Sequence, residues 1–286
     1  MASLGKVRSV IRDIFEYGNK RRREIGAENV YDFSLGNPSV PAPDEVSDAI
    51  SDLLTNFDPV ALHGYTSAVG DEGVRIAIAD DINKRFSAGV TKDDIYMTCG
   101  AAASLTVSLG AVINEGDEVV VIAPFFPEYR VFSEASGATL TVVPADTGTF
   151  QVDLTAFEAA ITPKTKAIII NSPNNPTGVV ITPEKINSLC EILTRKEAEY
   201  GKAIYLISDE PYRELVYDEK TAVPYLINLY DDTIVCYSFS KSLSLPGERI
   251  GYIVVSNRMK DNREVYAAVC GAGRALGYVC APSTMQ

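Results

Sequence analysis

The sequence predicts an α/β protein whose core is a doubly wound, mostly parallel β-sheet. Apolar, β-branched segments typical of buried strands alternate along the chain with segments in which apolar residues recur at helical spacing. Five of the strand segments run directly into short polar or glycine-rich motifs. Because functional sites of such folds collect at the carboxyl ends of the strands, we expect the five motifs to lie close together.

The composition favours an enzyme that acts on small solutes. With 286 residues, of which 46% are apolar, the chain is long enough for two domains, or for one large domain and part of a second. It carries 26 basic and 38 acidic residues, a net charge of −12. This balance argues against nucleic acid or an anionic membrane surface as a partner.

The cysteine and histidine content narrows the class further. The five cysteines are an odd set without CxxC spacing, and we interpret them as reduced core thiols. No apolar run approaches the roughly 18 to 20 residues of a membrane span, and the N-terminus lacks the apolar core of a secretory signal. We therefore expect a cytoplasmic protein without a membrane partner.

The single histidine, His63, excludes a histidine-based catalytic triad and a metal site of several histidines, so no metal is expected.

The first ninety residues are predicted to be mainly helical. Apolar residues at helical spacing predict a helix over residues 4–17, and the basic cluster at 20–23 is interpreted as its solvated end. A nucleic-acid or targeting role for this cluster is the alternative. A short strand is expected near Tyr31, followed by a glycine- and proline-rich turn, a helix over Asp44–Thr55 and another helix near 71–87.

The strand predicted over Ile95–Cys99 runs into Gly100-Ala101-Ala102-Ala103 and a helix. In such a turn, free backbone N–H groups and the positive end of the helix dipole face one point, where a phosphate can bind. Many α/β turns share this pattern, so the turn by itself is a weak signal.

Three further predicted strands end in motifs. The strands cover Glu118–Ala123, Lys166–Asn171 and Ala203–Ser208, and they run into Pro124-Phe125-Phe126-Pro127-Glu128-Tyr129, Ser172-Pro173-Asn174-Asn175-Pro176-Thr177-Gly178 and Asp209-Glu210-Pro211-Tyr212. The aromatic rings could equally be core residues, Asn-Pro-Thr-Gly is also a good turn, and Asp209 could be a helix cap. Thr182-Pro183 predicts the start of a helix that runs to about Tyr200.

The fifth motif contains a lysine in an unusual position. The apolar segments Thr233–Tyr237 and Ile250–Val255 predict two buried strands, which leaves Lys241 at a strand end in a loop of small hydroxyl residues. Burial and the nearby cation of Arg249 would both lower the pKa of this lysine and leave a nucleophilic amine that can form a Schiff base. An ordinary loop lysine is the alternative.

Two of these motifs resemble family signatures. Ser238-Phe239-Ser240-Lys241, followed by Pro246-Gly247-Glu248-Arg249-Ile250-Gly251, resembles the cofactor-lysine signature of the class I/II aminotransferases, the fold-type I pyridoxal-phosphate enzymes. Asn175-Pro176-Thr177-Gly178 resembles a second signature of that family, and the similarity covers about residues 30–286. It implies that residues 46–286 form the pyridoxal-phosphate-binding large domain, with a seven-stranded sheet between helices. Residues 1–45 would belong to a partial small domain, and the C-terminal small domain would be missing from this chain.

The resemblance also implies roles for the motif residues. Lys241 would hold the cofactor and move a proton, Asp209 would keep the ring nitrogen protonated, and Asn175 and Tyr212 would hydrogen-bond the phenolic oxygen. The remaining implied cofactor contacts are Phe126 stacked on the ring and, around the phosphate, the amides of Gly100, Ala101 and Ala102, the side chains of Ser238 and Arg249, and Tyr65 of the partner subunit. The family usually has hydroxyl side chains where this chain has alanines. The backbone amides would therefore have to supply more of the hydrogen bonds to the phosphate.

Substrate contacts are implied for Gly36, Asn175 and Arg274. Gly36 lies in Leu35-Gly36-Asn37-Pro38, a shorter version of a family loop that meets the substrate carboxylate. Arg274 would reach a distal carboxylate across a dimer interface. The family's arginine that clamps the α-carboxylate lies in the C-terminal small domain, and no arginine follows Arg274 in this sequence, where Ser283 is expected to cap a further helix.

The implied function is that of an aminotransferase with pyridoxal 5′-phosphate as cofactor. It would move an amino group between an L-amino acid, with aspartate as the first candidate, and a 2-oxo acid such as 2-oxoglutarate. A homodimer is the implied assembly. Two alternatives remain: a pyridoxal-phosphate-dependent C–S β-lyase, and a chain that binds the cofactor without activity.

Overall fold

The computed structural model describes residues 10–34, 36–218 and 220–280. The chain divides into two compact units, Met1–Pro41 and Ala42–Gln286, called here the N-terminal and the C-terminal unit. The sequence placed the first boundary at residues 45 and 46, and the assignment of these units to a small and a large domain stays a prediction.

In the described part of the N-terminal unit, the amphipathic helix α2 (Val10–Ile25) is followed by the short 3₁₀ helix η1 (Ala27–Asn29). Helix α2 runs beyond the predicted end at residue 17, and the part of that prediction before residue 10 lies outside the described residues. The strand expected near Tyr31 is wrong, because residues 30–33 have no regular structure. Tyr31 is 84% exposed and no neighbouring strand pairs with it within the described part of this unit.

The C-terminal unit begins with three helices, α3 (Asp44–Asn56), α4 (Pro59–Leu62) and α5 (Glu72–Phe86). The side chain of Asp71 caps α5 by accepting a hydrogen bond from the Val74 N–H. Both longer helices confirm the ranges that the sequence predicted. A 3₁₀ turn, η2 (Lys92–Asp94), then leads into the sheet.

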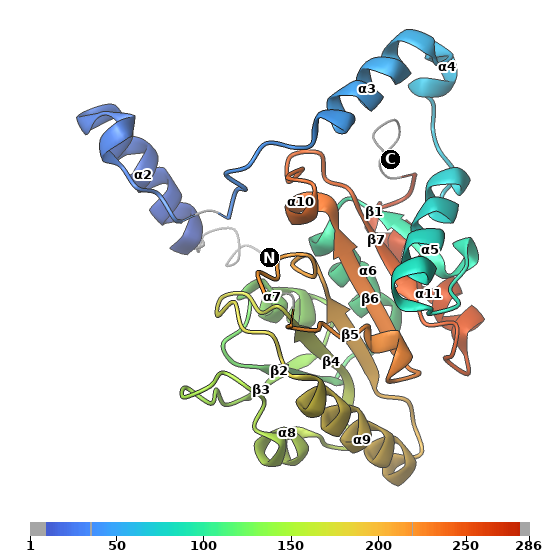
Figure 1. Cartoon of the computed structure of the whole chain (residues 1–286). Helices are drawn as coiled ribbons and strands as arrows, with labels where there is room; N and C mark the ends of the chain where they lie inside the picture. The colour runs from blue at the N-terminus through green and yellow to red at the C-terminus, as the bar shows by residue number, and fades with distance from the viewer. Residues whose placement is uncertain (1–9, 35, 219, 281–286) are drawn as a thin grey trace. The chain divides into compact units, whose positions relative to one another are not determined.

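Within the described residues, seven strands form one sheet in the order β1-β7-β6-β5-β4-β2-β3 (Figure 1). Their bounds are β1 Ile95–Thr98, β2 Glu118–Ile122, β3 Thr139–Val143, β4 Thr165–Asn171, β5 Tyr205–Asp209, β6 Thr233–Ser238 and β7 Gly251–Val255. Strands β2 to β6 pair in parallel, whereas β7 is antiparallel to both of its neighbours, β1 and β6. The predicted mostly parallel, seven-stranded sheet is therefore confirmed.

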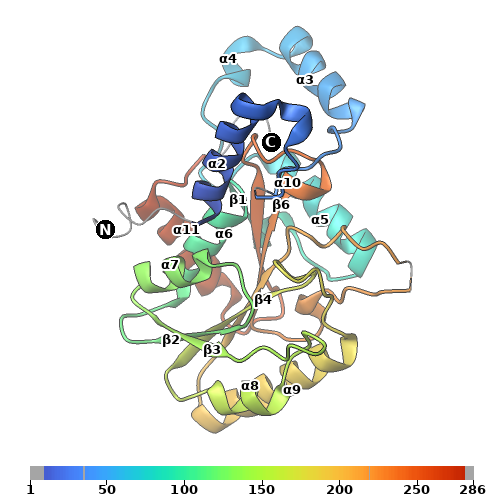
Figure 2. The same cartoon turned by 90° about the vertical axis from the view of Figure 1, so that its left-hand side faces the viewer.

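Helices cover both faces of this sheet, as the doubly wound prediction required (Figure 2). Alternate strand residues point to opposite faces: Val119 and Val121 belong to the core under one set of helices, and Val120 to the core under the other. The helices of the first set are α6 (Ala101–Val112), α7 (Glu128–Ala135) and α11 (Asn262–Leu276), and those of the second are α8 (Leu154–Ala160) and α9 (Pro183–Tyr200), with α5 beside them.

The start of α9 follows the prediction closely. The Thr182 side chain accepts a hydrogen bond from the Lys185 N–H, Pro183 occupies the first helical turn, and Gly201 ends the helix with φ of 66°.

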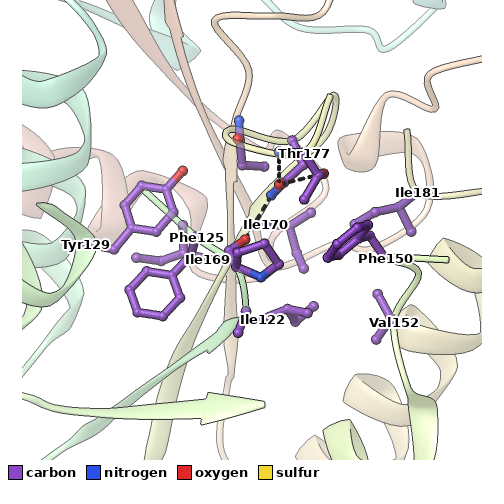
Figure 3. A pocket seen from close by; sticks show the side chains of 13 residues that line it. Ile122, Phe125, Tyr129, Phe150, Val152, Ile169, Ile170, Thr177 and Ile181 are labelled. Atoms are coloured by element: carbon purple, nitrogen blue, oxygen red, sulfur yellow. Dashed lines mark hydrogen bonds between the residues drawn. The ribbon is translucent and has the colours of Figure 1, made fainter. Parts of the chain in front are cut away.

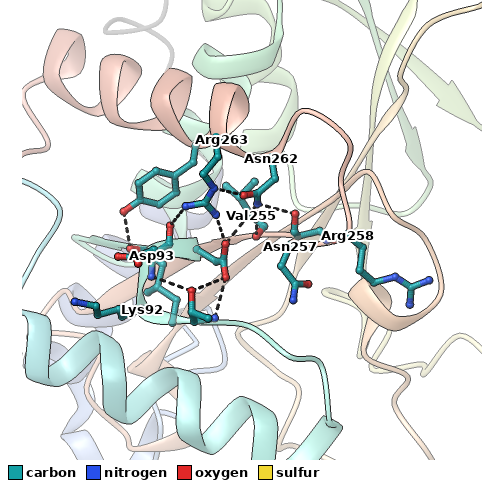
Figure 4. Close-up of polar contacts among 12 residues, drawn as sticks. Lys92, Asp93, Val255, Asn257, Arg258, Asn262 and Arg263 are labelled. Atoms are coloured by element: carbon teal, nitrogen blue, oxygen red, sulfur yellow. Dashed lines mark hydrogen bonds and ion pairs between the residues drawn. The ribbon is translucent and has the colours of Figure 1, made fainter.

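A buried carboxylate ties the last described helix to the first strand (Figure 4). Asp94 accepts hydrogen bonds from the Thr91 N–H at 2.8 Å and the Thr91 hydroxyl at 2.9 Å, and it forms an ion pair with Arg263 of α11. Asn262, which precedes Arg263 in the sequence, donates to the carbonyl oxygen of Ser256 at 2.8 Å. These bonds fix the N-terminal end of α11 against the edge of the sheet.

Among the described residues, no helix combines the length and the apolar character that a membrane span requires. The same residues contain no group of three or more histidine, cysteine or carboxylate side chains that could hold a metal ion.

Gly251 at the start of β7 gives a test of this packing. A Cβ atom there would overlap the Tyr237 carbonyl oxygen and lie 2.8 Å from Gly100 Cα. We expect Gly251→Ala to lower the free energy of unfolding by about 1 to 3 kcal/mol, because backbone on both sides cannot move aside. Urea unfolding followed by circular dichroism measures this loss. Gly271→Ala is the control: an added Cβ in α11 meets nothing within 4 Å, so stability should stay equal or rise.

Candidate functional site

Three of the predicted motifs follow neighbouring strands in the centre of the sheet. Asn171 ends β4, Asp209 ends β5 and Ser238 ends β6. Asn171 pairs with Asp209, and Asp209 pairs with Cys236, so the carboxyl ends of the three strands are in register. The side chains that follow these strands therefore gather at one edge of the sheet.

Asp209 is a buried carboxyl group at this edge. Its Oδ2 accepts a hydrogen bond from Tyr129 Oη at 2.5 Å, whereas its Oδ1 is buried and has no hydrogen-bond partner. The pKa of Asp209 is raised to about 7: burial is the largest cause, the nearby Glu210 carboxylate adds to it, and the Tyr129 hydrogen bond opposes it. A buried oxygen without a partner is costly, so this one indicates a place for a polar or cationic group. Asp209 ends a strand, and the alternative of a helix cap does not hold.

Tyr129 is a site residue that sequence reasoning did not single out. It lies in the first turn of α7, is 2% exposed, and packs between Phe125 and Phe126 at ring distances of 6.3 and 5.7 Å. Burial and the adjacent Asp209 carboxylate hold the pKa of Tyr129 well above its usual value, so its hydroxyl stays protonated and donates. Its place beside two phenylalanines made it indistinguishable from a core aromatic in the sequence.

Phe126 is partly buried and meets the Tyr129 ring edge-on, at an interplanar angle of 83°. Its role in stacking on a cofactor ring stays a prediction. A small cavity lies behind these residues, lined by Phe125, Tyr129, Asn171 and Thr177 among others (Figure 3). Its volume of about 20 Å³ suits a single water molecule and excludes a cofactor.

Asn175 and Tyr212, both predicted to contact one cofactor oxygen, are in direct contact with each other. The Asn175 Nδ2 donates a hydrogen bond to Tyr212 Oη at 3.1 Å. Asn171, a second residue that the sequence did not single out, holds this arrangement: its Oδ1 accepts from the Asn175 N–H at 2.6 Å, and its Nδ2 donates to the Asp209 carbonyl oxygen at 2.9 Å. Tyr212 also lines a surface groove of about 830 Å³, a volume common for small-molecule sites.

Glu210 faces away from this cluster although it is next to Asp209 in sequence. Its carboxylate is buried, accepts from the Ser208 hydroxyl at 2.6 Å and forms an ion pair with Arg213. A paired, buried carboxylate of this kind has its hydrogen bonds satisfied within the fold, in contrast to Asp209.

The glycine turn after β1 is the place where the sequence predicts a phosphate. Gly100 has φ of 93° and precedes α6, so the N–H groups of Ala101 and Ala102 lie in the first turn of a twelve-residue helix. The Arg249 guanidinium lies over Gly100, since a Cβ built there would be 3.1 Å from Arg249 Nη2. Ser238 ends β6 directly opposite Gly251 of β7, which closely approaches the same turn. The structure therefore brings together all five residues predicted to hold a phosphate from within one chain.

Lys241 lies in α10 (Phe239–Ser242), a single helical turn, and the prediction of a loop is corrected accordingly. The turn forms because backbone bonds such as Leu243 N–H to the Phe239 carbonyl close it at 3.3 Å. Lys241 is half-buried, and burial lowers its pKa. The expected contribution of Arg249 to this pKa is absent, because that guanidinium is exposed and donates to the Pro246 carbonyl oxygen at 3.2 Å, where water screens its charge.

Three predicted residues do not belong to the motifs that follow the strands. Tyr65 is 98% exposed in the loop after α4. Arg274 lies exposed in the last turn of α11, and Gly36 belongs to the N-terminal unit. The roles given to these three residues stay predictions, and Ser283, the expected helix cap, lies outside the described residues.

The seven-stranded sheet and its strand-end motifs are those of the fold-type I pyridoxal-phosphate fold. The family model described as aminotransferase class I and II matches residues 28–275, and the chain belongs to this family.

Known proteins resemble the chain over most of its length. It is 33% identical to the aspartate aminotransferase of Thermotoga maritima over 234 residues, which are 81% of this chain and 59% of that protein. An aminotransferase structure from Eubacterium rectale matches this chain with a TM-score of 0.96 at 56% identity. The match covers 99% of this chain and 71% of the Eubacterium rectale chain. The fold alone is shared with the aspartate aminotransferase of Thermus thermophilus with maleate, at a TM-score of 0.83 and 24% identity, covering 99% of this chain and 69% of that chain.

Pyridoxal 5′-phosphate is the cofactor of this family, and the residues present fit it. The unpartnered Asp209 Oδ1 suits a protonated ring nitrogen, and the Gly100 turn with Arg249 suits a phosphate. Asn175 and Tyr212 offer hydrogen bonds to a phenolic oxygen. The half-buried amine of Lys241 suits a covalent bond to an aldehyde.

The raised pKa of Asp209 predicts a pH-dependent stability of the cofactor-free chain. Between about pH 4, where an unfolded aspartate loses its proton, and pH 7, the folded chain binds more protons than the unfolded chain. The free energy of unfolding should therefore fall as the pH rises through this window, by up to about 4 kcal/mol for a shift of this size. Urea unfolding at a series of pH values measures the fall.

Asp209→Asn should remove this part of the pH dependence, because the amide does not titrate. Tyr129→Phe should extend the fall to higher pH, because it removes the hydrogen bond that favours the ionised carboxylate. Equal pH profiles for the parent chain and Asp209→Asn would contradict the assignment of the titration to this residue.

Proposed function

We propose that this chain belongs to a pyridoxal-phosphate-dependent aminotransferase that moves an amino group between an L-amino acid and a 2-oxo acid. The observation that carries the proposal is the buried Asp209 carboxyl with its unpartnered Oδ1, which stands at the end of the strand next to the one that leads to Lys241. We propose aspartate as the amino donor and 2-oxoglutarate as the acceptor. The similarity to an enzyme named aspartate aminotransferase supports the choice of donor.

When bound, pyridoxal phosphate supplies an electron-poor ring that accepts the electron pair of a C–H bond next to an amino group. Asp209 holds a proton at the ring nitrogen through its Oδ1, because a buried carboxylate is stabilised by a cation beside it. Lys241 Nζ moves a proton, since its lowered pKa leaves more of the unprotonated amine near neutral pH.

The other residues orient the cofactor. Asn175 keeps a second amide hydrogen and Tyr212 keeps its phenol hydrogen, so together they can donate to one anionic oxygen. The amides at the start of α6, the Ser238 hydroxyl and the Arg249 guanidinium bind the phosphate dianion. Phe126 packs on the ring.

Substrate contacts and assembly complete the proposal. We assign Gly36, Asn175 and Arg274 to the substrate, and Tyr65 to the phosphate of the neighbouring site in a homodimer. The 98% exposure of the Tyr65 side chain supports a contact outside its own chain. The five free cysteines support a reducing compartment such as the cytoplasm.

Covalent labelling tests the cofactor site. After incubation with pyridoxal 5′-phosphate and reduction with borohydride, peptide mass spectrometry should find the label on Lys241. Lys241→Ala should lose this label and lower aminotransferase turnover by at least roughly 100-fold, because the proton carrier is gone. Lys164→Ala, which removes an exposed lysine far along the sequence, is the matched control and should keep the label. A label of equal yield in both variants would contradict the proposal.

A product assay separates transfer from elimination. With aspartate as donor, keto-acid formation should require added 2-oxoglutarate and yield glutamate. If the protein instead releases pyruvate from cystathionine without any added oxo acid, it is a C–S β-lyase. A holoprotein that carries the label on Lys241 but performs neither reaction is the cofactor-binding chain without activity.

A further inference from the structure

The helical turn that carries Lys241 depends on its neighbours for its shape. Helix α10 has only four residues, and its N-cap residue, Ser238, makes no side-chain capping bond. A single turn of helix is unstable by itself, because nucleation fixes several dihedral angles for one hydrogen bond. The direction in which the Lys241 side chain leaves the backbone is therefore decided by contacts from other elements.

One such contact reaches Ser242, the residue after Lys241. The Tyr237 Oη lies 2.8 Å from Ser242 Oγ and 3.0 Å from Glu214 Oε2. A phenol has one hydrogen, which goes to the carboxylate as the stronger acceptor. The Ser242 hydroxyl therefore donates to Tyr237 Oη, and the serine is held at the end of a two-step hydrogen-bond chain.

The ring of Tyr237 holds the other end of the same turn. It is 6% exposed and stacks on Tyr252 at 4.9 Å and 25°. Phe239, the first residue of α10, meets it edge-on at 5.3 Å and 80°. Tyr237 thus contacts the residues two before and one after Lys241.

Glu214 is itself fixed from outside the sheet. Its Oε1 pairs with Arg85 Nη2 of α5 at 2.9 Å, and Arg85 also pairs with Asp81 at 3.2 Å. The Glu214 side chain is 27% exposed, so water screens this ion pair in part, but the carboxylate has a defined position. The chain of contacts runs from α5 through the turn after β5 and through β6 to α10.

We propose that Tyr237 and Glu214 are positioning residues for Lys241: their hydrogen bonds fix Ser242 and thereby the direction of the lysine side chain. The inference rests on the proposed function of Lys241 as the amine that binds the cofactor. It adds to that function two residues that contact neither cofactor nor substrate in the proposal above. Their effect on the reaction passes through the geometry of α10.

Tyr237→Phe tests this proposal because it keeps the ring and removes only the hydroxyl. The cofactor-free chain is treated briefly with acetic anhydride at a series of pH values, and mass spectrometry compares acetylation at Lys241 with acetylation at the exposed Lys164. A loosened turn lets water reach the Lys241 ammonium and raises its pKa toward the ordinary value. Below the titration midpoint, we expect relative acetylation of Lys241 to fall about 3- to 10-fold, the size of a shift of half a unit to one unit.

Ser242→Ala breaks the same chain from the other side and keeps the test valid if Tyr237→Phe folds poorly. It should shift the titration midpoint of Lys241 as far as Tyr237→Phe does. The double variant should shift it no further, because both changes remove the Tyr237–Ser242 hydrogen bond, through which the Glu214 contact also acts. Tyr230→Phe is the matched control. It removes a buried hydroxyl that donates to the Ile204 carbonyl oxygen at 2.8 Å, so it should lower stability and leave the Lys241 midpoint unchanged.

The outcomes separate this inference from the proposed function. Midpoints for Tyr237→Phe and Ser242→Ala equal to that of the parent chain, or equal shifts in Tyr230→Phe, would overturn the positioning role. Labelling with pyridoxal 5′-phosphate and borohydride tests the proposed function of Lys241 separately. If the parent chain carries no pyridoxal label on Lys241, the proposed function fails, whereas the acetylation profiles still show whether Tyr237 controls this amine.

Discussion

The site depends on one unfavourable arrangement, a carboxyl group buried with half of its hydrogen-bonding capacity unused. Asp209 receives one bond from Tyr129, and its other oxygen has no partner among the described residues. A core aspartate without a function would be paired as Glu210 is paired with Arg213, because unpaired burial costs folding free energy. A protonated ring nitrogen would give this oxygen a partner.

The sheet also brings together the residues that we propose for the two ends of the cofactor. Asp209, Asn175 and Tyr212, proposed for the ring, follow β4 and β5, whereas the residues proposed for the phosphate lie around β1, β6 and β7. Gly251 lets β7 approach the Gly100 turn so closely that no side chain fits between them. The antiparallel β7 therefore brings Arg249, at its start, over the N-terminus of α6.

Most elements of the fold could be predicted because local signals agreed with the final packing. The N-cap at Thr182 and the buried runs of β4, β5 and β6 are examples. Strand β3 was not predicted: it is short, lies at the sheet edge beside β2, and no motif that the sequence analysis recognised marks its end. The strand expected near Tyr31 did not form, since an apolar pattern without a partner strand cannot pair.

The sequence by itself determined the fold class, the family resemblance and the predicted cofactor residues, because signature motifs are local and strand ends of a doubly wound sheet converge. Only the tertiary structure revealed Tyr129, Asn171 and Tyr237, each of which acts on a residue distant in sequence or on a neighbouring turn through its hydrogen bonds. Tertiary packing also decided that Asp209 is raised in pKa and that burial alone lowers the pKa of Lys241. Burial and hydrogen-bond partners arise from contacts between distant segments, and no local pattern encodes them.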